Sequence, residues 1–353
     1  MENKKAKWLA EYDAGILDSS KWPRLNYTKC VNGKAEAVKG DPNHTFKCKN
    51  VDLYDFINHA TLGSSNGYPD TGIYPFLTGS GSWGWVDPES GREFVASGMY
   101  DGTAFLEILP EGRFAQLGFL PCPAKTNPNA LWKELRGYKN YMLIGSELSG
   151  HGVQIFDMKK LLSIPKGSAV VTFDIVKDVT GHFMDLPDAA SHNVVVSEER
   201  EYGVAVGSRP RMAGSCKGGL IFFDLKDPSK PKKLGCNPDD GYVHDAQCLV
   251  YRGPHTKYVG RDICYGYNED SLTIYDVTDK ANSTIISITS YEGATYTHQG
   301  WVLDPNNQEY LVMDDEIDEI DSAGPAADKY AVTYIWDIKD LEHPKQTGLY
   351  KSE

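Results

Sequence analysis

Three histidines stand at equivalent places in a repeated pattern, and their side chains are well suited to chemistry. His192, His244 and His298 each open an apolar segment, at intervals of 52 residues (192 to 244) and 54 residues (244 to 298). Imidazole titrates near neutral pH and is a common ligand for transition metals. If the three lie together they can act as acid and base or hold a metal ion. The alternative is that each only hydrogen-bonds within its own strand.

The histidines belong to a longer repeat that extends over most of the chain. A third apolar segment of each unit ends on an acid, at Glu107, Asp157, Asp224, Asp276 and Asp337. A period near about fifty residues with three or four short strands per unit is typical of β-propeller blades. We place the five repeats at roughly 81–122, 128–180, 188–236, 240–290 and 294–350. The expected fold class is therefore an all-β propeller with five repeats visible.

The elements that position the histidines are the first strands of these repeats. In a propeller the innermost strand of each blade lines a central channel, so residues at one register converge there. We expect His192, His244 and His298 to face this channel. Trp132, and Trp83 or Trp85, stand at the corresponding places in the earlier repeats.

Aromatic side chains accompany the inner strands. Trp83, Trp85, Trp132, Tyr267 and Tyr296 stand at or beside strand ends, where they can line a pocket for a flat or apolar ligand. Packing between blades is the alternative, and we favour it for Trp301 and Trp336.

An acidic run covers residues 314–321. Its carboxylates can hold calcium, but the run does not have the spacing of an EF-hand, so we favour a solvated loop. Asp314 is the exception. It ends a second strand and is expected to reach the channel mouth, and Glu147 occupies a similar place in the second repeat.

Composition excludes several functional classes. The net charge of -13 argues against nucleic acids and anionic membranes as partners. No apolar run approaches the roughly 20 residues of a membrane-spanning helix. Phosphate-binding loops, nucleophile elbows and zinc-protease helices are absent from the sequence. We divide the chain into an extension, 1–50, and a propeller domain, 51–353.

Seven cysteines suggest an oxidising compartment. Three local pairs are expected, Cys30 with Cys48, Cys216 with Cys236, and Cys248 with Cys264, which leaves Cys122. Seven buried thiols are the alternative. Glycosylation sequons begin at Asn26, Asn43 and Asn282. The charged start of the sequence has no apolar segment. Either the signal peptide is not part of this sequence or the protein is cytosolic, and from the cysteines and sequons we expect a secreted or luminal protein.

The motifs around the histidines resemble those of one protein family. They are Tyr242–Cys248, Tyr296–Trp301, Asp314–Glu316, Ser191–Val194 and Ser82–Trp85. Over residues 25 to 353 the chain resembles the secreted β-propellers called choice-of-anchor B or LVIVD-repeat proteins, in their fungal form. The resemblance implies an extracytoplasmic location, disulfides and an inner ring of histidines. Members of this family usually continue through a further blade, so we expect five to seven blades in the ring.

Some fungal relatives are similar to hetero-Diels–Alderases of tropolone sesquiterpene pathways. The resemblance implies a cyclase that joins a tropolone quinone methide to a macrocyclic alkene, with small apolar or aromatic molecules as substrates and no cofactor or metal. The expected polar catalytic groups are His244, His298 and Tyr296. The expected substrate-binding residues are Trp83, Trp85, Trp132, His192, Tyr267 and Asp314. Two other functions stay open: a secreted ligand-binding or scaffold propeller, and a metal-dependent hydrolase or lyase that uses the three histidines.

Overall fold

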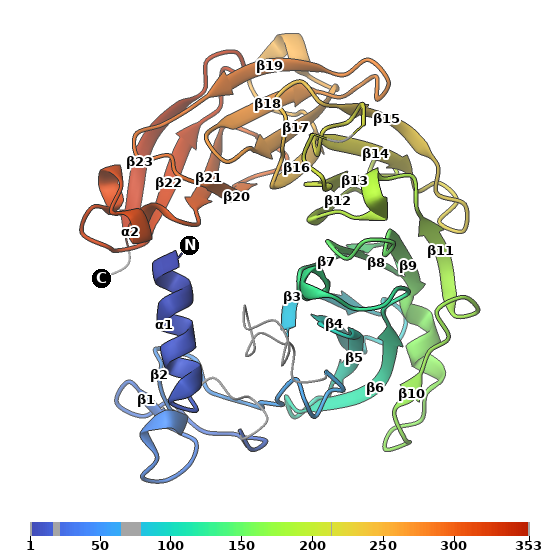
Figure 1. Ribbon diagram of the computed structural model, residues 1–353, viewed down its shortest axis with the longest axis vertical. Helices are drawn as coiled ribbons and strands as arrows, with labels where there is room; N and C mark the ends of the chain where they lie inside the picture. Colours follow the sequence, from blue (N-terminus) through green and yellow to red (C-terminus); the bar gives the residue numbers. More distant parts are fainter. Residues whose placement is uncertain (1, 17–21, 65–78, 213, 352–353) are drawn as a thin grey trace. The chain divides into compact units, whose positions relative to one another are not determined.

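The computed structural model describes residues 2–16, 22–64, 79–212 and 214–351 (Figure 1). The chain forms two compact units. Unit 1 contains Leu143–Phe156 and Thr180–Glu353, and unit 2 contains Glu2–Met142 and Asp157–Val179. All three histidines belong to unit 1.

Each expected repeat corresponds to one sheet of four or five strands, although the boundaries of the first two differ from those expected. The first sheet, ordered β10-β6-β5-β4-β3, consists of β3 (Gly79–Val86), β4 (Glu93–Met99), β5 (Gly102–Ile108), β6 (Phe114–Pro121) and β10 (Val171–Thr172). The second, ordered β11-β9-β8-β7, consists of β7 (Lys133–Tyr138), β8 (Tyr141–Ser146), β9 (Val153–Asp157) and β11 (Val179–Phe183). The repeat pattern predicts these sheets except for β10, which lies within the expected second repeat, 128–180, but pairs in parallel with β6 of the first sheet.

The last three sheets keep the order of the chain. The third consists of β12 (Asn193–Ser197), β13 (Tyr202–Val206), β14 (Leu220–Asp224) and β15 (Lys233–Asn237). The fourth consists of β16 (Asp245–Val250), β17 (Asp262–Tyr267), β18 (Leu272–Asp276) and β19 (Thr284–Thr289). The fifth consists of β20 (Thr297–Val302), β21 (Tyr310–Asp315), β22 (Val332–Asp337) and β23 (Lys345–Lys351). Four-stranded antiparallel meanders of this kind are propeller blades, so the all-β propeller class is confirmed. The number of blades in the ring stays a prediction.

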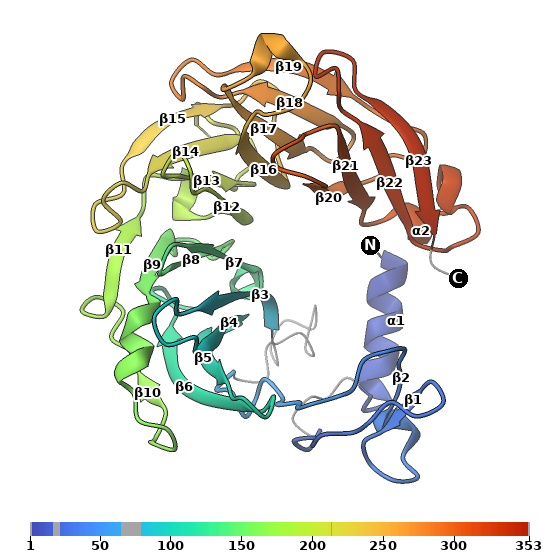
Figure 2. The same cartoon turned by 180° about the vertical axis from the view of Figure 1, so that it is seen from behind.

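Within unit 1 the last three sheets stand side by side through their first strands. β12 neighbours β16, and β16 neighbours β20. Figure 1 shows β12, β16 and β20 at the same end of their sheets, and Figure 2 shows the same order from behind. Equivalent residues at the starts of these strands are thereby brought close together.

Apolar side chains fill the spaces between these sheets. Strands β17 and β18 are buried at every position, because neighbouring sheets cover both of their faces. One core cluster joins the third and fourth sheets and another joins the fourth and fifth. Trp336 is 0% exposed in the second cluster, which confirms the packing role expected for it. The same expectation is wrong for Trp301, which is 51% exposed.

Unit 2 contains the first sheet, an N-terminal helix and a small hairpin. The helix is α1 (Glu2–Asp13), and the hairpin pairs β1 (Lys34–Glu36) with β2 (Thr45–Lys47). The short helices among the described residues are η2 (Pro42–His44), η3 (Pro128–Leu131), η4 (Met158–Ser163), η5 (Pro187–Ala189), η6 (Thr256–Tyr258), α2 (Asp318–Asp321) and η7 (Gly324–Ala326). Within the described ranges none of the helices has the length and apolarity needed to cross a membrane. The expected domain division at residue 50 stays a prediction.

The three expected disulfides are all present. They join Cys30 to Cys48, Cys216 to Cys236 and Cys248 to Cys264, and Cys122 is a free thiol. Cys248 and Cys264 face each other directly across β16 and β17. This pattern is compatible with an extracellular or secretory location.

Candidate active site

Three imidazoles form a row at the starts of β12, β16 and β20. His192 and His244 directly precede their strands, and His298 is the second residue of β20. The ring centroid of His244 lies 4.2 Å from that of His192 and 4.3 Å from that of His298. The structure thus brings together the three histidines that the repeat pattern singled out.

Each imidazole is oriented by an acceptor beside its Nδ1 atom. His192 Nδ1 lies 2.6 Å from Glu147 Oε1, and His244 Nδ1 lies 2.9 Å from the backbone oxygen of His298. A carbonyl can only accept, so Nδ1 of His244 carries the proton and Nε2 keeps its lone pair. His298 Nδ1 lies 3.4 Å from Asp314 Oδ2, in an ion pair that does not meet hydrogen-bond geometry.

The surroundings shift the pKa values of His244 and His298 in opposite directions. Burial, reinforced by the neighbouring His192 and His298, holds the pKa of His244 well below its usual range. Burial also acts to lower the pKa of His298, but the interaction with Asp314 outweighs it and the pKa of His298 is raised. A neutral base therefore stands next to a group that retains a proton more readily.

Tyr296 and Arg211 extend the polar cluster. The Tyr296 ring meets the His244 ring edge-on at a centroid distance of 5.4 Å. Arg211 Nη2 lies 3.4 Å from the Tyr296 hydroxyl, and the guanidinium also covers the Tyr242 ring at 3.9 Å. Burial raises the pKa of Tyr296, so its hydroxyl stays protonated and can donate a hydrogen bond. No sequence signal identified Arg211, which lies in the long loop between β13 and β14.

A buried carboxylate anchors the loop segments next to the histidines. Asp315 is 5% exposed, and its side chain accepts hydrogen bonds from the backbone N–H groups of Thr295, Tyr296, Ile317 and Asp318. These bonds fix the backbone on either side of Glu316 and at Tyr296. The interpretation of the acidic run as a solvated loop is therefore wrong for Asp315 and for Asp318, which is 0% exposed. The polar residues of this loop do not indicate, in the sequence, which backbone N–H groups will bind the Asp315 carboxylate.

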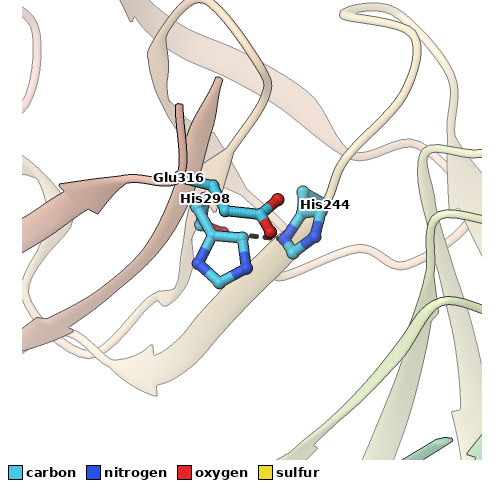
Figure 3. A group of neighbouring side chains, drawn as sticks. All are labelled: His244, His298 and Glu316. Carbon is cyan, nitrogen blue, oxygen red and sulfur yellow. Dashed lines mark hydrogen bonds between the residues drawn. The ribbon is translucent and has the colours of Figure 1, made fainter. Parts of the chain in front are cut away.

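Glu316 joins His244 and His298 in a group that sequence reasoning did not foresee. One ligand atom from each of the three side chains lies within 4.8 Å of the others. Figure 3 shows the Glu316 carboxylate extending toward the His244 imidazole, with the His298 ring beside it. Two imidazoles and a carboxylate are a donor set that can hold a divalent metal ion.

Tyr267 and Asp314 take different places around the row. Tyr267 is 0% exposed and packs against Gly300, where a side chain would collide with its ring. Its ring therefore packs against the backbone of β20 at Gly300. Asp314 accepts a hydrogen bond from the backbone N–H of Gln299 and holds His298 in the ion pair described above.

The predicted tryptophans belong to unit 2. Trp83 lies under the guanidinium of Arg136, at 4.6 Å from the ring centroid. Trp85 is 9% exposed and stacks on Phe94 at 5.5 Å. Trp132 ends the η3 turn directly before β7 and is half-buried. Their role in substrate binding stays a prediction.

Comparison with known proteins finds distant structural similarities and no relative in sequence. No protein family and no curated protein matches the chain. A protein from Lactobacillus plantarum is similar in structure at 11% identity with a TM-score of 0.47, covering 91% of this chain and 80% of that one. A functionally unknown protein from Desulfotomaculum acetoxidans matches at 9% identity with a TM-score of 0.49, covering 87% and 76%.

A putative 6-phosphogluconolactonase from Bacteroides fragilis matches at 8% identity with a TM-score of 0.42, covering 93% of this chain and 94% of that one. Similarity at this level carries no argument about fold or function. The assignment to the β-propellers rests on the repeated sheets described above, and the function must be argued from the site.

Proposed function

We propose that this protein is a cyclase that promotes a hetero-Diels–Alder reaction between a tropolone quinone methide and a macrocyclic sesquiterpene alkene. The observation that carries the proposal is the row of three imidazoles with the phenol of Tyr296 at its side. The motifs that hold these residues are the same motifs through which the sequence resembles fungal hetero-Diels–Alderases.

The polar groups suit the formation of the reactive diene. A hydroxymethyl tropolone becomes a quinone methide when it loses water, which requires removal of the ring hydroxyl proton and protonation of the departing hydroxide. His244 presents a lone pair on Nε2, because its Nδ1 proton is held by a backbone carbonyl. His298, paired with Asp314, is the proton donor. A base and an acid on adjacent strands divide the two proton transfers between them.

The cycloaddition itself needs positioning more than proton transfer. It forms one carbon–carbon and one carbon–oxygen bond and moves no proton. Holding two reactants in a reactive pose can supply about 7–11 kcal/mol of the barrier. A hydrogen bond from the Tyr296 hydroxyl to the oxygen of the diene would make the diene more electrophilic.

The test supplies purified protein with a hydroxymethyl tropolone and hydroxylated humulene, and measures product formation and enantiomeric ratio against buffer. We expect acceleration and one dominant enantiomer. His244→Ala should lower the rate by about 10²–10⁴-fold where dehydration limits it. When the quinone methide is supplied preformed, the loss should be smaller. The exposed His343, 74% accessible at its side chain, gives the control variant His343→Ala.

Racemic product at the background rate would contradict the cyclase. If the protein nevertheless bound either substrate, it would be a ligand-binding propeller. Loss of preformed-substrate turnover in His244→Ala would instead indicate chemistry centred on the histidines and not on positioning.

We propose further that the protein works outside the cytosol. The asparagines of the three sequons, Asn26, Asn43 and Asn282, are all exposed, as glycosylation requires. Expression through a fungal secretory pathway should give a protein whose mass falls after removal of N-glycans. An unglycosylated product with reduced cysteines from the native source would contradict this location.

A further inference from the structure

We propose that His244, His298 and Glu316 form a binding site for one divalent first-row transition-metal ion. The inference goes beyond the proposed function, which requires no metal, and a bound ion would occupy the lone pairs of His244 and His298, so that it would replace these two imidazoles as the polar catalyst. It rests on the arrangement of these side chains in unit 1, and its test requires no substrate.

The three ligands come from separate strands that meet at one end of their sheets. His244 precedes β16, His298 lies in β20, and Glu316 directly follows β21. Their ligand atoms lie within 4.8 Å of one another, and Figure 3 shows the three side chains grouped together. Zinc–ligand bonds of about 2.0–2.2 Å require only a modest contraction of such a group.

The backbone holds the carboxylate in place. The N–H of Glu316 donates to the backbone oxygen of Tyr296 at 3.0 Å. The neighbouring Asp315 ties the same segment to Thr295 and Asp318 through its buried carboxylate. Hydrogen bonds therefore hold the backbone at Glu316 in a defined position.

The contacts made by the ring nitrogens of His244 and His298 also fit a metal centre. Histidines that bind metals usually donate their other ring N–H to a carbonyl or carboxylate, which fixes the ring. His244 has this contact with the backbone oxygen of His298. His298 has a buried Nδ1 atom that makes no hydrogen bond to any described residue, although Asp314 Oδ2 lies 3.4 Å away. A buried ring nitrogen without a hydrogen bond is uncommon and calls for a ligand.

The charges of the nearby side chains and the number of protein ligands favour a divalent cation that keeps coordination positions free for water or substrate. Two imidazoles are neutral ligands, and the carboxylates of Glu316 and Asp314 together balance a double positive charge. Two histidines with one carboxylate occur in catalytic zinc sites and in non-haem iron sites, where the remaining positions are left for water or substrate. An ion here would act as a Lewis acid on a substrate oxygen.

A second group provides an internal comparison. His255, Asp340 and Glu342 also meet the spacing of metal ligands. However, Lys257 and Tyr258 both bind the Glu342 carboxylate, and the backbone N–H of Leu341 donates to His255 Nδ1 at 3.1 Å. One Glu342 oxygen and His255 Nδ1 thus have donors already, and this group is also more exposed than the group around His244, so we assign no metal to it.

The experiment titrates Co²⁺ into protein that has been treated with a chelator, and follows visible cobalt absorption and heat of binding. We expect one ion per chain, displaced by Zn²⁺. Glu316→Gln keeps the side-chain size but removes the anionic ligand, so binding should weaken at least about tenfold. Glu342→Gln is the matched control and should bind cobalt like the unmodified protein.

Several results would overturn the proposal. They are the absence of saturable cobalt binding, unchanged binding in Glu316→Gln, and loss of binding in Glu342→Gln. Circular dichroism checks that each variant is folded. If Glu316→Gln does not fold, His298→Asn takes its place, with the same weakening expected and unchanged binding again counting against the site.

Discussion

The carboxylate of Glu147 and the imidazole of His192 are joined at 2.6 Å, although 45 residues separate them in the chain. Glu147 follows the second strand of one sheet, and His192 opens the first strand of the next. Glu147 is 3% exposed and also lies 3.3 Å from Arg209. One buried carboxylate thus orients a site histidine and pairs with an arginine.

Removing the charge of Glu147 should lower stability. In Glu147→Gln the two donors, His192 and Arg209, lose an anionic acceptor, and a hydrogen bond to a charged group is worth about 1.5–3 kcal/mol. Urea unfolding measures the difference. Glu111→Gln at an exposed position is the control and should stay within about 0.5 kcal/mol of the parent. Equal stability of the two variants would show that the Glu147 contacts contribute nothing.

The ion pair between His298 and Asp314 should be visible in a titration. Because Asp314 raises the pKa of His298, Asp314→Asn should lower it. NMR of the imidazole in metal-free protein measures the change, and the exposed Asp321→Asn is the control.

The same pair has a predictable effect on stability. The folded-state pKa of His298 lies above its unfolded value, so its contribution is fully present below about pH 6.5 and is lost as pH rises through the folded pKa. Asp314→Asn should remove this contribution. A parent and variant with identical pH profiles of stability would contradict the assignment.

The disulfides predict a simple thiol count. Unfolded, unreduced protein should expose one reactive thiol, that of Cys122. Replacing Cys248 and Cys264 together by serine should cost roughly 2–5 kcal/mol in unfolding free energy. Cys122→Ser is the comparison, since it breaks no bridge. Five or more reactive thiols per chain would rule out both the bridges and the secreted location.

Asp318 should make stability fall with rising pH. Burial raises its pKa to about 7, although the Tyr334 hydroxyl donates to its carboxylate at 2.7 Å. The folded state then keeps a proton that the unfolded state releases above about pH 4, so the unfolding free energy declines between about pH 4 and 7 and levels off beyond. Asp318→Asn should remove this decline, as measured by denaturation at a series of pH values. A decline of the same size in the variant would place the titrating group elsewhere.

The sequence alone determined the equivalent positions of His192, His244 and His298, and it predicted the strand repeat and the three disulfide pairs that the structure contains. These features follow from regular intervals. Successive blades repeat the same succession of strands, so residues at one register reach the same end of neighbouring sheets. Cysteines separated by one hairpin likewise come together when the hairpin forms.

Only the tertiary structure decided how deeply individual polar and aromatic residues are buried. Trp301 and Trp336 look alike in the sequence, yet one is half-exposed and the other fully enclosed by the neighbouring sheet. Asp315 and Asp318 look like a solvated run, yet each is buried where hydrogen-bond donors from distant segments meet it. Glu316 and Arg211 likewise come close to the histidines only because segments distant in the sequence pack together. Loop residues have no periodicity, so their partners are set by non-local packing, which a local pattern in the sequence does not contain.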